Sequence, residues 1–199
     1  LSLVKSAPAA VAPGSTFTYA LSVANAGPSA VGLGALTFSN NTFITINDAT
    51  TAVPYPSTIT VTGLTTVTKV TATLVNITHT WPSDIDVLLV GPTGTYVILM
   101  SNVGGGEPVT NLTLTLDSDA ADSLPIASML TSGTYQPTNP DAPDVFAAPG
   151  PGTITQPSPS LTVYYGTVPN VVWSLYVVDE GIETEEKFEI EWDDDSKNK

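Results

Sequence analysis

The residues that could carry out a reaction in this chain are few. His79 is the only histidine, and the chain contains neither cysteine nor arginine. General acid–base catalysis or a nucleophilic triad would therefore have to run through His79, yet no Gly-x-Ser-x-Gly nucleophile elbow accompanies it. Asp84 and Asp86 offer the carboxylate pair of a glycosidase, but nothing supplies the aromatic cleft that sugar chemistry needs. We therefore predict no catalytic residues and no enzymatic activity.

Aspartates near the predicted strand ends point instead to calcium. Calcium takes roughly six to eight hard oxygen ligands, commonly carboxylates and backbone carbonyls from loops. Asp84 and Asp86 stand two apart in the sequence, so that they share one face of a strand. The alternative, that these aspartates only cap turns, stays open because no EF-hand spacing is present. The predicted calcium ligands are Asp84, Asp86, Asp117, Asp119 and Asp179.

Three other groups of residues have a functional and a structural interpretation. The tryptophans could form a sugar-stacking platform, but Trp173 and Trp192 are in phase with the apolar residues of their strands, which favours core packing for Trp81, Trp173 and Trp192. The acidic run of residues 179–195 is interpreted as the wet side of an outer strand. Asn-x-Thr sequons, which also arise by chance in a threonine-rich chain, make candidate glycosylation sites of Asn40, Asn76 and Asn111.

Composition and charge exclude several classes of partner. The net charge is −14, and the few lysines do not form the basic cluster that nucleic acid binding requires. No stretch of 18 apolar residues could span a membrane. Since the chain begins with Leu1 rather than methionine, we expect a processed or trimmed product. An acidic chain of this kind attracts divalent cations instead.

The hydrophobic pattern predicts an all-β fold. Residues 15–24 alternate cleanly, which places Phe17, Tyr19, Leu21 and Val23 on one face of a strand. Short strands are predicted at 36–38, 43–46, 58–62, 67–77, 85–90, 96–100, 112–116, 161–165, 171–178 and 187–192. Residues 117–160 lack a period and are expected to be either a binding surface or a cover for a sheet edge. Strands this short with turn signals between them indicate a jelly-roll-type β-sandwich with an N-terminal strand extension.

A family resemblance rests on three motifs: the stretch from His79 to Thr95, which reads HTWPSDIDVLLVGPTGT, then GTYQPT from Gly133, and WSLYVVD from Trp173. In this order they resemble the P-domain, the β-sandwich that follows the protease in kexin- and furin-type proprotein convertases. The resemblance covers residues 58–192 and implies a structural His79 and, as in some relatives, bound calcium. Two departures, at residues 168–173 and 182–187, indicate adaptation to a role other than capping a protease. The first 31 residues separately look like part of a repeat of prokaryotic surface proteins.

Three segments follow from these patterns: an N-terminal strand and hinge over 1–34, a P-domain-like sandwich over 35–192 and a polar tail over 193–199. The favoured function is a non-catalytic structural module outside the cell or on its surface. It would assemble into fibres with copies of itself by donating the 15–24 strand to a neighbour's sheet. The alternative is an accessory or binding domain of a larger secreted hydrolase or adhesin, whose partners are the neighbouring domains.

Overall fold

Strands make up nearly all of the regular structure of this protein. The computed structural model describes residues 15–24 and 36–181, and the elements below belong to this part of the chain. The strands are β1 (Ser15–Ala24), β2 (Leu36–Ile46), β3 (Ser57–Thr60), β4 (Lys69–His79), β5 (Ile85–Val90), β6 (Tyr96–Met100), β7 (Val109–Leu116), β8 (Gly133–Tyr135), β9 (Asp144–Phe146), β10 (Gly152–Ile154) and β11 (Val172–Asp179). Three short 3-10 helices connect them: η1 (Pro82–Asp84), η2 (Pro92–Gly94) and η3 (Leu161–Tyr164). The all-β prediction is confirmed.

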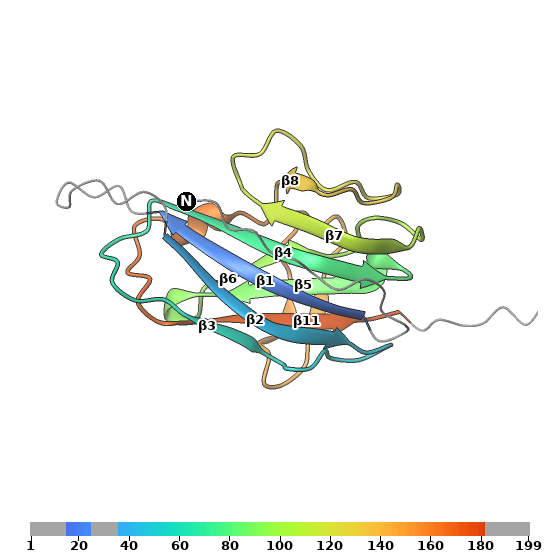
Figure 1. The fold of residues 1–199 in the computed structure, drawn as a ribbon, viewed down its shortest axis with the longest axis horizontal. Helices are drawn as coiled ribbons and strands as arrows, with labels where there is room; N and C mark the ends of the chain where they lie inside the picture. The colour runs from blue at the N-terminus through green and yellow to red at the C-terminus, as the bar shows by residue number, and fades with distance from the viewer. Residues whose placement is uncertain (1–14, 25–35, 182–199) are drawn as a thin grey trace, which may run out of the picture.

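Two sheets form the sandwich (Figure 1). One has five strands in the order β2-β1-β4-β7-β8, and the other has four in the order β3-β11-β5-β6. Neighbouring strands are antiparallel except for β7 and β8, which run parallel. β1 is a central strand, because it pairs with β2 along one side and with β4 along the other. The N-terminal segment and the sandwich therefore share one sheet.

The core lies between the sheets and follows the alternation of side chains along each strand. In β4 every second residue from Val70 is buried until a register shift after Leu74. In β11, Trp173, Leu175 and Val177 face the same core from the other sheet, and each is almost fully buried. This apolar layer provides the main driving force for folding.

A third layer covers the outer face of the four-stranded sheet. Strand β5 is buried on both sides, because Leu88 and its neighbours pack against the β9–β10 hairpin instead of facing water. Phe146 of β9 and Ile154 of β10 join Leu88, Ile98 and Val178 in a second apolar cluster. The near-continuous apolar sequence of β5 reflects this double burial.

The long segment of residues 117–160 covers a sheet edge. Strand β6 is the last strand of its sheet, and Thr138 exchanges backbone hydrogen bonds with Leu99 and Ser101 beside it. The Gln156 side chain continues this cover, since its Oε1 accepts from Ile98 N at 2.8 Å and its Nε2 donates to Tyr96 O at 3.3 Å. Of the two expected roles of this segment, the structure thus shows the cover, which blocks edge-to-edge pairing at β6.

Some predicted elements need correction. The predicted strand 161–165 is not a strand, because residues 161–164 form the 3-10 helix η3. The predicted strands 36–38 and 43–46 are one strand, β2, which shows a register shift against β1 between Phe17 and Tyr19. The predicted strand 187–192, including Trp192, and the polar tail 193–199 lie outside the described residues. No helix in the described ranges is long and apolar enough to cross a membrane.

Candidate functional site

The predicted calcium ligands lie at two opposite ends of the sandwich. Strand β4 connects them, because Lys69 is its first residue and His79 its last. Asp117 and Asp119 contact Lys69, whereas Asp179 contacts His79. The five aspartates therefore cannot surround one ion.

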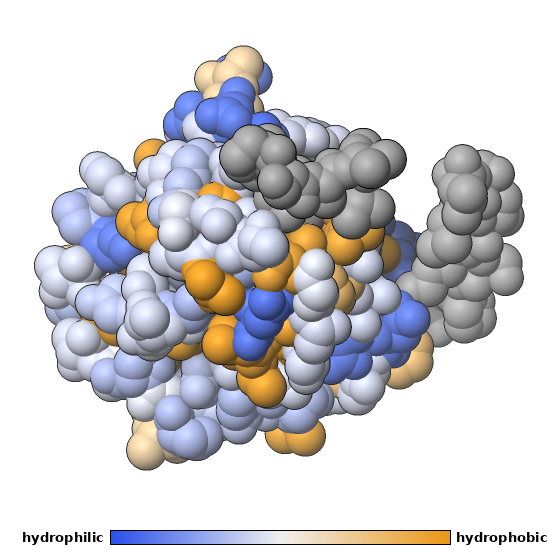
Figure 2. All heavy atoms as spheres, turned by 90° about the vertical axis from the view of Figure 1, so that its left-hand side faces the viewer, coloured by the Kyte–Doolittle hydropathy of each residue, from blue (hydrophilic) through white to orange (hydrophobic). Residues whose placement is uncertain are grey.

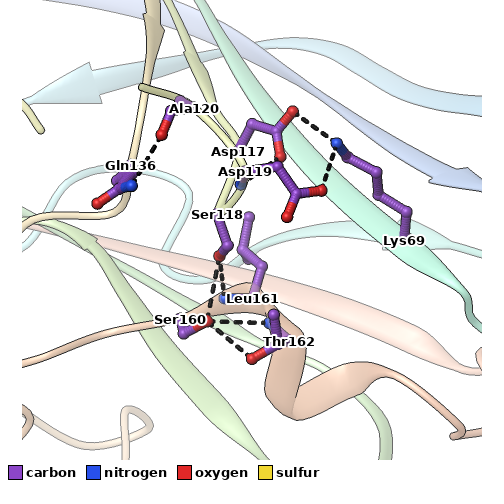
Figure 3. A network of polar contacts seen from close by, with 9 residues as sticks. All are labelled: Lys69, Asp117, Ser118, Asp119, Ala120, Gln136, Ser160, Leu161 and Thr162. Atoms are coloured by element: carbon purple, nitrogen blue, oxygen red, sulfur yellow. Dashed lines mark hydrogen bonds and ion pairs between the residues drawn. The ribbon is translucent and has the colours of Figure 1, made fainter. Parts of the chain in front are cut away.

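At the Lys69 end, the two aspartates hold the ammonium group between them (Figure 3). Lys69 Nζ lies 2.9 Å from Asp117 Oδ2 and 2.8 Å from Asp119 Oδ2. The hydrogen bonds to Asp119 and then Asp117 raise the pKa of Lys69. Because Lys69 already supplies the positive charge, a metal ion here would have to displace it.

Beside this ion pair, Ser118 ties the end of β7 to η3 (Figure 3). Its Oγ accepts from Leu161 N at 2.8 Å and lies 3.3 Å from Ser160 Oγ. A groove of about 510 Å³ adjoins it, lined mostly by serine, proline and threonine between residues 118 and 160. Within the part of the chain that the structure describes, no ionisable side chain lines the groove.

At the other end, His79 and Asp179 join the two sheets. His79 ends β4 and Asp179 ends β11, both side chains are buried, and His79 Nε2 lies 2.9 Å from Asp179 Oδ2. The backbone N–H of Trp81 donates to His79 Nδ1 at 3.1 Å, which places the proton of the neutral ring on Nε2. Burial, opposed by the His79 contact, raises the pKa of Asp179. Both ring nitrogens are occupied by structural bonds, so His79 has none left to act as a general base.

Asp86 is the most unusual ionisable residue of the described chain. It lies in β5 beside Val178 of β11, on the face that packs against the β9–β10 hairpin. Its side chain is 1% exposed, and neither carboxylate oxygen has a hydrogen-bond partner among residues 15–24 and 36–181. Burial raises the pKa of Asp86 to about 8; the nearby Ser101 hydroxyl lowers it, and the carboxylates of Glu180, Asp144 and Asp84 raise it further.

Asp144, the first residue of β9, is by contrast fully partnered. Ser101 Oγ donates to its Oδ1 at 2.5 Å and Asn139 Nδ2 donates to its Oδ2 at 2.8 Å. Because Ser101 has one hydroxyl proton and gives it to Asp144, that proton is not available to Asp86. Asp144, Ser101 and Asn139 are all at most 2% exposed. They form a buried polar network beside Asp86, which receives no donor from the described part of the chain.

More carboxylates lie around Asp86. Glu180 follows β11, and its backbone N–H donates to Asp84 O at 2.9 Å. Burial, followed by repulsion from Asp144 and Asp84, raises the pKa of Glu180. Even so, no three or more His, Asp or Glu side chains of residues 15–24 and 36–181 converge as a ready-made metal cluster. The calcium prediction therefore remains a prediction.

Sequence reasoning identified Asp86 but missed Ser101, Asn139 and Asp144. Asn139 and Asp144 lie in the part of the chain that showed no period, and Ser101 directly follows β6. A weak signal existed, since Asn139 directly follows the GTYQPT motif. Nothing in the sequence placed that motif against β5.

The other predicted site residues have varied surroundings. Among the sequon asparagines, Asn111 is exposed, Asn76 is half-buried, and the Asn40 amide donates to Thr58 O at 2.9 Å and to Ser57 Oγ at 3.2 Å. Trp173 is buried as expected, whereas Trp81 is 49% exposed. For Phe17, Tyr19, Leu21 and Val23, the side chains lie outside the description, and only the position of their strand is stated.

Exposed valines occur at the Lys69 end of the molecule. Figure 2 looks onto this end and shows apolar patches set among polar residues. Val163 of η3 is 45% exposed and Val168, in the loop before β11, is 60% exposed. Such residues offer contact area to another protein surface, although scattered exposed apolar residues are also normal.

Comparison with known proteins identifies one family. Residues 67–126 match the family model of the proprotein convertase P-domain, a stretch that includes β4, β5, β6 and β7. The P-domain-like resemblance is thereby confirmed for this stretch, while the surface-repeat resemblance of the N-terminal segment stays a prediction. Neither the curated proteins nor the solved structures gave a match. In proprotein convertases the P-domain is a non-catalytic accessory domain, and it occurs in secreted proteins.

Proposed function

We propose that this chain is a non-catalytic accessory module that works outside the cell and holds or stabilises a neighbouring protein domain. The observation that carries the proposal is the P-domain match, because it spans strands from the centre of both sheets and not a peripheral motif. The exposed valines of the Lys69 end offer contact area for such a neighbour. The coarse composition agrees, since the surface has few charges and no basic cluster.

The geometry of His79 supports a non-catalytic role. An acid–base catalyst needs a ring nitrogen that can reach substrate. His79 is 8% exposed and uses Nδ1 for Trp81 and Nε2 for Asp179. The bond to Asp179 connects the end of β4 to the end of β11, which gives His79 a structural role.

An activity panel tests the non-catalytic part. We expect the purified chain to show no turnover of peptide, ester or glycoside substrates above buffer, and the variant His79→Gln to behave identically. Asp122→Asn, at an exposed position away from the buried acids, serves as the matched control. Hydrolysis that His79→Gln abolishes and Asp122→Asn retains would overturn the proposal.

Cross-linking on the native cell or secretion surface tests the accessory part. With 19 acidic residues and five lysines, a carboxylate-directed reagent is the appropriate choice. We expect one dominant conjugate with a different polypeptide domain. A ladder of multiples of 20.6 kDa would instead show self-association and contradict the accessory role.

A self-assembling fibre subunit is the second candidate, and the position of β1 favours it. Because β1 lies between β2 and β4, removing it from the sheet would leave a gap in which the hydrogen-bonding edges of β2 and β4 are both unpaired. The same strand of another copy would fit that gap in the same register, which is donor-strand exchange. Repeated head-to-tail exchange builds an open filament. A stable monomer at all concentrations would remove this candidate.

A further inference from the structure

Asp86 has an environment that the fold alone does not explain. In the described chain it is the one buried carboxylate with both oxygens unpartnered. Burying a charged group without a hydrogen bond or counter-charge is strongly unfavourable. Native proteins therefore pair such groups, and an exception in a well-packed region indicates a missing partner.

We propose that Asp86 and Asp144 form the centre of a binding site for a hard divalent cation, calcium in particular. The two residues come from β5 and β9, and the site lies between the four-stranded sheet and the hairpin that covers its outer face. This inference goes beyond the accessory role, and either one can fail without the other.

The arrangement of hydrogen-bond donors favours a cation as the partner of Asp86. Among the described residues, Ser101 and Asn139 direct two donors at Asp144, and none points at Asp86. Both Asp86 oxygens are therefore available as ligands, and each Asp144 oxygen keeps a second lone pair. The negative charges of Glu180, Asp144 and Asp84 repel Asp86 and raise its pKa further. A bound cation would offset this repulsion.

Calcium fits the available ligands better than other common metals. Two carboxylates are joined here by neutral oxygens such as Ser101 Oγ, and calcium accepts such mixed oxygen sets in irregular geometry. Magnesium demands near-ideal octahedral geometry and gives up its water reluctantly. Zinc prefers His and Cys ligands, but the chain has no cysteine and His79 is engaged elsewhere. Asp84 and Glu180, whose charges also act on Asp86, would favour a cation without having to contact it.

Calorimetry and thermal unfolding with CaCl₂ test the site. We expect the chelator-treated full chain to bind calcium in a saturable manner at pH 7.5. At a hundredfold excess over Kd, its Tm should rise by roughly 5–10 °C. Absence of both a binding heat and a Tm shift would overturn the proposal.

The variant Asp86→Asn separates a cation site from a purely structural acid. We expect it to lose the calcium-dependent Tm shift while its Tm in excess chelator equals or exceeds that of the wild type, because the cost of burying or protonating an unpartnered acid is gone. A structural role alone would lower the Tm in chelator. Retention of the full calcium shift by Asp86→Asn would contradict the assignment.

Asp117→Asn is the matched control, because Asp117 was predicted as a ligand but contacts Lys69. We expect it to keep the calcium shift of the wild type. If Asp117→Asn loses the shift and Asp86→Asn keeps it, calcium binds at the Lys69 end and the proposed site is wrong. If chelator and calcium give the same wild-type Tm while acidification raises it, protonation alone neutralises Asp86, which also overturns the proposal.

Discussion

One histidine and two tyrosines show how single residues connect distant parts of the sandwich. His79 links the sheets through Asp179, and Tyr55 Oη donates to Ala147 O at 3.1 Å across 92 residues of sequence. Tyr164 is fully buried and donates to Leu89 O at 2.8 Å. In each case an apolar body fills the interior while its polar end finds a specific acceptor. The two phenols make stability depend on pH, because ionisation of a tyrosine removes its donor.

Tyr164 gives a prediction for alkaline pH. Burial raises its pKa above the ordinary value of 10. Because the folded state binds this proton more tightly, its contribution to stability is complete below about pH 10 and falls as the pH rises further toward the folded-state pKa. Tyr164→Phe should therefore lose less stability than the wild type between about pH 10 and 12. At pH 7 the variant should be less stable by about 1 kcal/mol, because it lacks the hydrogen bond.

Urea unfolding at pH 7, 10 and 11.5 measures this difference. Tyr55→Phe is the comparison, since burial raises the pKa of Tyr55 to about 12 and it also contributes in this range. Parallel loss of stability in the wild type and Tyr164→Phe would show that the buried phenol does not govern alkaline unfolding.

Residue types alone revealed part of the candidate site. The spacing of Asp84 and Asp86 predicted both as calcium ligands on one strand. In the structure Asp84 belongs to η1 and is half-buried, whereas Asp86 is buried in β5. The difference arises because the β9–β10 hairpin packs over β5. No local pattern encodes that contact, since the hairpin lies more than 50 residues away along the chain.

At the scale of elements, η2 shows how a short turn depends on the core beneath it. Gly91 precedes η2, and a Cβ atom there would lie 2.6 Å from the Trp173 ring and 2.7 Å from the Tyr164 ring. These two rings meet edge to face with centroids 4.7 Å apart. The turn can pass over them only because residue 91 has no side chain.

Gly91→Ala is accordingly expected to destabilise the protein by about 1–3 kcal/mol through overpacking. The φ of Gly91 is −116°, so alanine adds no backbone strain and the clash alone is measured. Gly94→Asn in the same turn is the control: a Cβ there meets nothing within 4 Å, and asparagine tolerates its φ of +77°. Thermal unfolding should separate the two variants, and equal Tm values would argue against the clash.

Strands with a clear period were predictable, and shorter elements were not. The bounds of β1, β5 and β6 match those expected from alternation or from apolar runs. β8, β9 and β10 have three residues each, which is too short for a period to register. Residues 161–165 alternate like a strand, but the Ser160 side chain accepts from Thr162 N and begins η3. A local cap thus overrode the pattern.

For the whole molecule, the central question is whether β1 pairs within or between copies. Ala20 is the register partner of Thr73, and the chain has no native cysteine. The double variant Ala20→Cys, Thr73→Cys therefore reports the pairing directly. We expect mild oxidation of a dilute sample to give an intramolecular disulfide and a monomer on a non-reducing gel.

Disulfide-linked multimers from this variant, in amounts that do not change on dilution before oxidation, would show strand exchange and favour the fibre. Ala20→Cys with Asp122→Cys is the matched control. It carries the same two thiols, but Asp122 is not a register partner of β1. The control should form neither product in high yield.

The central position of β1 also sets the order in which the sheet can be completed. Ala20 and Thr73 are 53 residues apart (73 − 20). Pairing β1 with β4 therefore closes a long loop, and the loss of chain entropy comes before any strand contact can offset it. During synthesis or export from the N-terminus, β1 emerges long before β4 and has only β2 to pair with until then. A high contact order of this kind slows folding. At high local concentration, the time for which β1 remains without β4 would then decide whether β1 pairs within its own chain or with a neighbouring copy.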